Sequence, residues 1–125
     1  MKILIVEDEK LLADSIKTML EGRGFQVEAV YDGETGADYA ELGIYDLLIL
    51  DVMMPKMDGF SVLKEIRQYS QVPVLMLTAK GEESDELAGF RYGADEYISK
   101  PFSPKVLIAR VEALLKSCRV LNDSR

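Results

Sequence analysis

The sequence predicts an α/β fold, in which five parallel strands form a doubly wound sheet in the order 2-1-3-4-5 together with five helices. Strand-like runs alternate with helical patterns along the whole chain, which implies right-handed crossovers and helices on both faces of the sheet. Three of the strand runs are unbroken apolar stretches, whereas the second alternates with polar residues and the fifth is brief. Because unbroken apolar runs are typical of strands buried on both faces, these three occupy the centre of the sheet and the other two its edges.

The strand runs are defined by their apolar residues and by the residues that bound them. In the second run, Phe25, Val27 and Ala29 alternate with polar neighbours, as in a half-exposed edge strand. Pro73 stands at the start of the fourth run, and Tyr97 begins the fifth. The five runs cover residues 3–6, 25–29, 47–50, 74–77 and 97–98.

The helices are indicated by apolar residues that recur every three or four positions. Gly22 ends the first helix, and Asp58 with Gly59 opens the third. Ser103 is the predicted N-cap of the last helix, with Pro104 at its first helical position. Strong patterns cover positions 12–20, 62–66 and 107–115, and weaker ones cover about residues 34–42 and 82–92.

Composition excludes several classes of function. The chain has 125 residues, about one domain, with a net charge of −7 and no histidine. An acidic domain lacks the electrostatic footprint of a nucleic-acid binder, and the absence of histidine excludes histidine-based zinc sites and catalytic triads. The single cysteine, Cys118, excludes an internal disulfide and is typical of a reducing compartment. No apolar run is long enough to cross a membrane and no signal peptide is evident, so we expect a cytoplasmic protein without membrane contact.

Polar residues follow four strands at the edge where such a sheet binds ligands. In this flavodoxin-like arrangement, ligands lie beyond the carboxyl ends of the strands, near the switch point between strands one and three. Glu7 and Asp8 follow the first strand, Asp51 the third, Thr78 the fourth and Lys100 the fifth. Carboxylates this close repel one another unless a cation joins them. Oxygen ligands without histidine or cysteine nearby favour Mg²⁺ over zinc.

These residue types suit phosphoryl chemistry. Asp51 can attack phosphorus as a nucleophile and form an aspartyl phosphate. Mg²⁺ on the three carboxylates would offset their repulsion of an incoming phosphoryl group. Lys100 supplies a point positive charge for the phosphoryl oxygens, and Thr78 can hydrogen-bond another oxygen. Small Ala79 would leave its backbone N–H open to the same group.

Each of these residues also has a structural interpretation when taken alone. Asp8 can be a helix N-cap, Asp51 a turn residue and Lys100 a surface lysine. Their conjunction at one edge of the predicted sheet favours a functional site.

At this point the chain resembles a response regulator receiver domain, the CheY-like phosphoacceptor of two-component signalling, over about residues 2–118. The resemblance implies a signalling protein rather than an enzyme, in which Asp51 accepts a phosphoryl group from the histidine of a sensor histidine kinase. Its motifs are Val6-Glu7-Asp8, Asp51-Val-Met-Met-Pro55 with Asp58-Gly59, Thr78-Ala79 and Lys100-Pro101-Phe102.

The resemblance also implies roles for the neighbouring residues. Glu7, Asp8 and Asp51 would bind Mg²⁺, with the backbone carbonyl of Met53 as a further ligand. Thr78 and Lys100 would sense the phosphoryl group, and Tyr97 would turn inward when Thr78 moves. The peptide bond between Lys100 and Pro101 would be cis. Tyr97 taken alone is also consistent with a half-buried edge-strand tyrosine that has no switching role.

Residues 93–104 and 109–111 resemble the OmpR/PhoB type of receiver in particular. That type forms homodimers on phosphorylation through the fourth helix, fifth strand and fifth helix, and it carries a C-terminal winged-helix domain that binds DNA. We therefore expect a receiver domain over 1–118, with 119–125 as a tail or the start of a linker to an absent output domain. A stand-alone receiver that signals only through protein contacts is the alternative.

The expected dimer face departs from the family pattern at several charged positions. Exposed ion pairs contribute about 0–1 kcal/mol each, so we expect a dimer with weaker charge specificity. The expected charges are kept at Asp95, Glu96 and Arg110 and are changed at Glu86, Val106 and Ser117.

Other function classes on this fold are disfavoured by single positions. Phosphatases of the haloacid dehalogenase type place a second aspartate two residues after the nucleophile, where this chain has Met53. Flavin and nucleotide binders need glycine or hydroxyl donors after the first strand, where Glu7-Asp8-Glu9 would repel a phosphate that lacks a metal. A silent receiver-like interaction module tends to lose the acids or the lysine, and all are present here.

Overall fold

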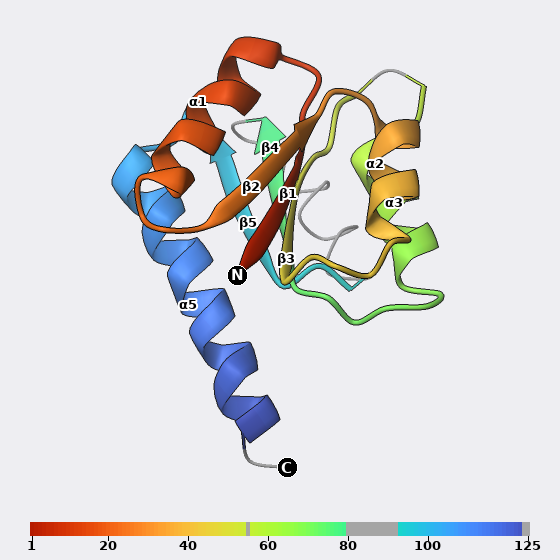
Figure 1. The fold of residues 1–125 in the computed structure, drawn as a ribbon. Helices are drawn as coiled ribbons and strands as arrows, with labels where there is room; N and C mark the ends of the chain where they lie inside the picture. Colours follow the sequence, from red (N-terminus) through yellow and green to blue (C-terminus); the bar gives the residue numbers. More distant parts are fainter. Residues whose placement is uncertain (55, 80–92, 124–125) are drawn as a thin grey trace.

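The strands of the computed structural model form one parallel sheet in the order β2-β1-β3-β4-β5, so the predicted fold class is confirmed (Figure 1). The structure describes residues 1–54, 56–79 and 93–123, with side chains as far as residue 117. The strands are β1 (Lys2–Val6), β2 (Gln26–Val30), β3 (Leu47–Asp51), β4 (Val74–Ala79) and β5 (Glu96–Lys100).

Helices cover both faces of this sheet. In Figure 1, α1 and α5 lie on one side of the sheet and α2 and α3 on the other, and α5 runs past the sheet towards the C-terminus. The helix predicted over 82–92 lies outside the described residues. Within the described ranges, no helix is both long and apolar enough to cross a membrane. The helices are α1 (Lys10–Glu21), α2 (Gly33–Ala40), α3 (Gly59–Ile66) and α5 (Pro104–Asp123).

The sheet separates two apolar clusters because side chains on a strand point alternately to its two faces. Ile3 and Ile5 of β1 pack on the side of α1 and α5, whereas Leu4 and Val6 pack on the side of α2 and α3. All five residues of β3 are buried, as expected for a central strand. The predicted edge strands β2 and β5 keep partly exposed residues.

Two aspartates fix where α2 and α3 begin. Asp58 Oδ1 accepts a hydrogen bond from Ser61 N at 2.9 Å, which makes it the N-cap of α3. Asp32 Oδ1 accepts one from Thr35 N at 2.7 Å in the same way, so α2 begins at Gly33, one residue before the predicted start. Both caps place a helix N-terminus at the same edge as the carboxyl ends of the strands.

Candidate functional site

Three carboxylates meet at the carboxyl edge of the sheet. Glu7 directly follows β1, Asp8 begins the loop to α1, and Asp51 is the last residue of β3. One oxygen from each lies within 4.8 Å of the oxygens of the other two. The neighbouring pairing of β1 and β3, which aligns Val6 with Leu50, brings these residues together. The sequence-predicted acid cluster is therefore present as a spatial group.

Lys100 bridges the two buried members of this cluster. Its Nζ lies 2.7 Å from Glu7 Oε1 and 3.2 Å from Asp51 Oδ2. Glu7 is fully buried and Asp51 is 3% exposed, whereas Asp8 is open to solvent. Lys100 thus sits where the sequence predicted it, at the end of β5, and its ammonium partly balances two buried carboxyl groups.

Burial changes the protonation of this cluster. Burial and a hydrogen bond shared with Asp51 raise the pKa of Glu7 to about 8, although Lys100 opposes the change. Burial also raises the pKa of Asp51, against the lowering effect of Glu7 and Lys100. Burial lowers the pKa of Lys100, but its hydrogen bond to Glu7 and the charge of Asp51 raise it above its ordinary value. Burial therefore favours the neutral form of both Glu7 and Asp51, and Lys100, within 3.2 Å of each, favours their ionised form.

The donor set fits a hard divalent cation. Three carboxylate oxygens, two of them from buried residues, converge in a chain without histidine, and the ammonium group of Lys100 is the one that contacts them among the described residues. Oxygen ligands of this kind suit Mg²⁺, and Asp8 at the exposed side leaves the cluster open to solvent.

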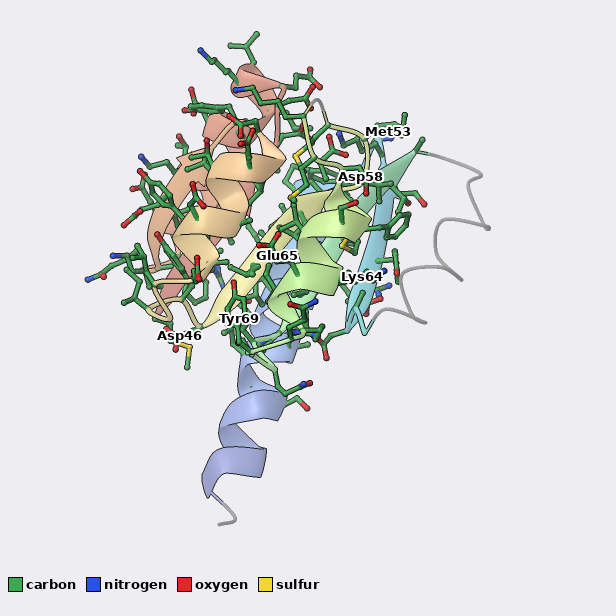
Figure 2. The ribbon with its side chains drawn as sticks, turned by 90° about the vertical axis from the view of Figure 1, so that its right-hand side faces the viewer. Asp46, Met53, Asp58, Lys64, Glu65 and Tyr69 are labelled. Carbon is green, nitrogen blue, oxygen red and sulfur yellow. The ribbon has the colours of Figure 1, made fainter. Side chains whose placement is uncertain are left out.

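Met53 lies beside the acid cluster through its backbone. Its N–H donates a hydrogen bond to Asp51 Oδ1 at 3.3 Å, and its side chain is 70% exposed. Figure 2 shows Met53 at the same end of the molecule as Asp58, and Asp46 and Tyr69 at the opposite end. The loop between β3 and α3 therefore borders the site, as the ligand role predicted for the Met53 carbonyl requires.

The remaining predicted residues lie on β4 and β5. Thr78 is 1% exposed, and among the described residues its Oγ1 accepts and donates no hydrogen bond. Ala79 is exposed at the end of β4. Tyr97 is 7% exposed and packs within the apolar cluster on the side of α2 and α3. The peptide bond between Lys100 and Pro101 is cis.

An open cavity of about 410 Å³ adjoins the site. It is mostly apolar, and two of its lining residues, the α1 N-cap Glu9 and Leu12 in the first turn of α1, were not predicted as site residues. Glu9 N also donates a hydrogen bond to Glu7 Oε2 at 3.1 Å. The helical pattern around Leu12 marked it as a core residue, so the sequence carried no signal for a lining role. The full lining is Glu9, Leu12, Ala79, Lys100, Pro101 and Phe102.

The charged residues of the predicted dimer face are paired within the chain. Nη2 of Arg67, which directly follows α3, lies 3.1 Å from Asp95 Oδ2. Arg110 on α5 forms an ion pair with Glu96. Arg67 was not identified from the sequence as the partner of Asp95. Val106 is 43% exposed and Ser117 is exposed, whereas Glu86 lies outside the described residues.

Gly59 controls the packing of α3 against the strand that carries Asp51. A Cβ at Gly59 would lie 2.2 Å from the backbone oxygen of Asp51. We expect Gly59→Ala to destabilise the protein by about 2 kcal/mol or more, because backbone must move to admit the methyl group. Gly22→Ala is the matched control, since Gly22 is αR with φ −63° and its nearest contact would be 3.4 Å. That change should stabilise by about 0.4–1 kcal/mol. Urea unfolding compares the two, and equal effects would contradict this account.

The family model for the response regulator receiver domain matches residues 3–112. This chain belongs to that family. The match covers most of the chain and confirms the family predicted from the motifs of the sequence. The receiver domain is accordingly a signalling module of a two-component response regulator.

Curated relatives of this receiver domain are regulators of about twice its length. Regulatory protein VanRc of Enterococcus gallinarum is 46% identical over 123 residues, which are 98% of this chain and 53% of the relative. Transcriptional regulatory protein CpxR of Escherichia coli K12 is 48% identical over 115 residues, which are 92% of this chain and 49% of the relative. The receiver domain therefore spans about half the length of these relatives.

Two solved receiver domains share the fold over nearly their whole length. The receiver domain of Francisella response regulator 1452 superposes with a TM-score of 0.88 at 36% identity, covering 94% of this chain and 98% of that chain. The receiver domain of the Pseudomonas aeruginosa sensor histidine kinase PA1611, solved with a magnesium ion in its active site cleft, gives a TM-score of 0.84 at 31% identity. That match covers 92% of this chain and 97% of the other.

Proposed function

We propose that this receiver domain accepts a phosphoryl group on Asp51 from the histidine of a sensor kinase, in a reaction that depends on Mg²⁺. The observation that carries the proposal is the buried Asp51 carboxylate, 3.2 Å from Lys100 Nζ and grouped with the carboxylates of Glu7 and Asp8, with Asp8 at the solvent side. An ionised carboxylate is a competent nucleophile without a general base, and the adjacent ammonium of Lys100 favours the ionised form of Asp51.

Each residue of the cluster has a separate role in the proposed phosphoryl transfer. An Asp51 oxygen attacks phosphorus and forms the new P–O bond, while the bond between phosphorus and the donor's histidine nitrogen breaks and its electron pair stays on that nitrogen. Bound Mg²⁺ would neutralise charge on the phosphoryl oxygens, and Glu7, Asp8, Asp51 and the Met53 carbonyl would hold it. Lys100, already 3.2 Å from Asp51, would pair with a phosphoryl oxygen.

Phosphorylation would then shift the population of two arrangements of the domain. Thr78 supports this, because its buried hydroxyl has no hydrogen-bond partner among the described residues and would gain one from a phosphoryl oxygen. Ala79, exposed at the end of β4, would offer its backbone N–H. Tyr97 is already buried in the apolar cluster on the side of α2 and α3, so the inward turn expected from the sequence has no room here; it would instead change its packing as Thr78 moves, so that contacts at the site bias the surface of β5.

The output of this shift is proposed from the relatives. Several are called transcriptional regulatory proteins and are about twice as long as this chain, which supports a receiver joined to a DNA-binding domain. Since α5 continues to Asp123, most of the segment 119–125 that was expected to be a tail or the start of a linker is helical. The phosphorylated form would pair through the face that includes Asp95, Glu96 and Arg110. Sedimentation of the beryllofluoride-bound domain at one monomer mass over a wide concentration range would count against the dimer and favour a stand-alone receiver.

Intact mass after incubation with acetyl phosphate tests the phosphoacceptor role. We expect one added phosphoryl group in the presence of Mg²⁺, and none when EDTA replaces the metal or when the variant is Asp51→Asn. The matched control is Asp58→Asn, because Asp58 is an N-cap at the same edge but not a member of the cluster. An adduct that persists in Asp51→Asn would contradict the proposal.

A further inference from the structure

Arg67 ties together three segments at the edge of the sheet opposite the acid cluster. It follows α3 directly, and its side chain is only 13% exposed. Nη1 donates to the carbonyl oxygens of Ser70 and Val72, at 3.2 and 2.7 Å. Nε donates to the Gly93 carbonyl at 3.0 Å, and Nη2 to Asp95 Oδ2 at 3.1 Å. Every nitrogen of the guanidinium group therefore donates a hydrogen bond. Lysine could not replace this arrangement, because it lacks the planar, rigid set of donors that a guanidinium group has.

The contacts of Asp95 extend this arrangement to the starts of two strands. Asp95 Oδ2 also accepts a hydrogen bond from Val74 N at 2.9 Å, and Asp95 N donates to Val74 O at 2.9 Å. Val74 begins β4, and Asp95 immediately precedes β5. A Cβ at Gly93 would lie 3.2 Å from Arg67 Nε, so the guanidinium also packs tightly on the turn before β5. We call Arg67, Gly93, Asp95 and Val74 the strand clamp.

The strand clamp lies at the opposite ends of the strands that carry the site. The carboxyl end of β4 carries Thr78 and Ala79, and that of β5 carries Lys100. The two strands pair in register from Leu75 with Glu96 to Ala79 with Lys100. If the starts of both strands are fixed, the strands cannot slide when a ligand binds at their carboxyl ends. The side chains near the ligand must then change conformation instead.

We infer that Arg67 is a positioning residue that fixes the starts of β4 and β5, so that a phosphoryl group at their ends moves side chains and not strands. The inference rests on the proposed function and extends it to a residue far from the acid cluster. The inferred role of Arg67 is to limit how far the strands move when a ligand binds. A purely structural role of the ion pair between Arg67 and Asp95 would affect the free and the ligand-bound protein equally.

Hydrogen exchange with and without beryllofluoride and Mg²⁺ tests the inference on residues 93–97. At a protein concentration where sedimentation shows monomers, so that pairing does not cover Asp95 and Glu96, we expect the ligand to change exchange there in the wild type by less than about twofold. In Arg67→Met we expect the ligand to change it by about tenfold, because the starts of the strands are then free to respond. Arg67→Lys, which restores one donor, should give an intermediate change. Asp95→Asn keeps an acceptor for Val74 N, so it tests the clamp if Arg67→Met fails to fold.

The matched control is Arg23→Met, which breaks an ion pair with Glu112 elsewhere in the molecule. It should leave the ligand-dependent change at 93–97 as small as in the wild type. A purely structural role would instead speed exchange at 93–97 equally with and without ligand in Arg67→Met, and that result would overturn the inference. A large ligand-dependent change in the wild type would overturn it as well. Failure of the wild type to bind beryllofluoride would reject the proposed function and this inference together. Equal acceleration with and without ligand in Arg67→Met, or a large ligand-dependent change in the wild type, would reject the inference alone and leave phosphorylation of Asp51 standing.

Discussion

Glu7→Gln is expected to stabilise the metal-free protein strongly at alkaline pH. Glu7 has a pKa of about 8 in the folded protein against 4.5 for the free side chain. As pH rises from about 4.5 to about 8, the unfolded chain loses this proton while the folded protein keeps it, so stability falls over that window and is then constant. Each pH unit corresponds to about 1.4 kcal/mol, and a neutral glutamine removes this loss. We expect Glu7→Gln to exceed the wild type by at least about 2 kcal/mol at pH 8.5 and to match it near pH 5.

Urea unfolding in EDTA at the two pH values measures this difference. Glu65→Gln is the matched control, because Glu65 lies on the exposed side of α3 (Figure 2) and its replacement should change little at either pH. Adding Mg²⁺ at pH 8.5 should stabilise the wild type more than Glu7→Gln, since the variant has lost one carboxylate ligand. Equal stabilities of wild type and Glu7→Gln at pH 8.5 would show that Glu7 is not held in its protonated form.

Lys100→Met is expected to be the most damaging substitution at the site. It leaves the buried Asp51 carboxylate without the ammonium that lies 3.2 Å away. Removing one partner of a buried ion pair costs about 3–5 kcal/mol, and the partial exposure of Lys100 places this case near the lower figure. The loss should shrink at acid pH, because protonation of Asp51 removes the uncompensated charge.

Thermal or urea unfolding at pH 7.5 and pH 4 checks the sign and the pH dependence. Mg²⁺ should recover part of the stability of Lys100→Met at pH 7.5, since a cation at the carboxylates replaces the lost charge. Lys64→Met on α3 provides the control, because Lys64 is exposed (Figure 2) and its loss should change stability by less than about 0.5 kcal/mol. A variant as stable as this control would mean that Lys100 does not compensate the carboxylates.

The strand order and the acid cluster could be predicted because they depend on local patterns and one topological rule. Unbroken apolar runs such as 47–50 identify central strands wherever they occur. Once the strand order is known, the residues that follow the parallel strands must lie at one edge of the sheet. This rule predicts from the sequence that Glu7, Asp51 and Lys100 lie close together.

The protonation of the cluster and the strand clamp could not be predicted in this way. The pKa of Glu7 depends on how completely the folded chain excludes water around it, which no pattern of residues expresses. The partner of Asp95 is Arg67, 28 residues away, and many basic residues stand at comparable distances along the chain. Arg67 becomes the partner of Asp95 because the turn at Gly93, whose carbonyl accepts a hydrogen bond from Arg67 Nε, places Asp95 beside the guanidinium group.

The most direct test of the central claim is to locate the phosphoryl group chemically. Wild-type protein phosphorylated with acetyl phosphate and Mg²⁺ is treated with borohydride, which reduces an aspartyl phosphate to homoserine, and its peptides are then analysed by mass. The account predicts homoserine at position 51 and at no other aspartate. Reduction at Asp8 or at another acid, or an unmodified Asp51 in protein that carries the added mass, would contradict it.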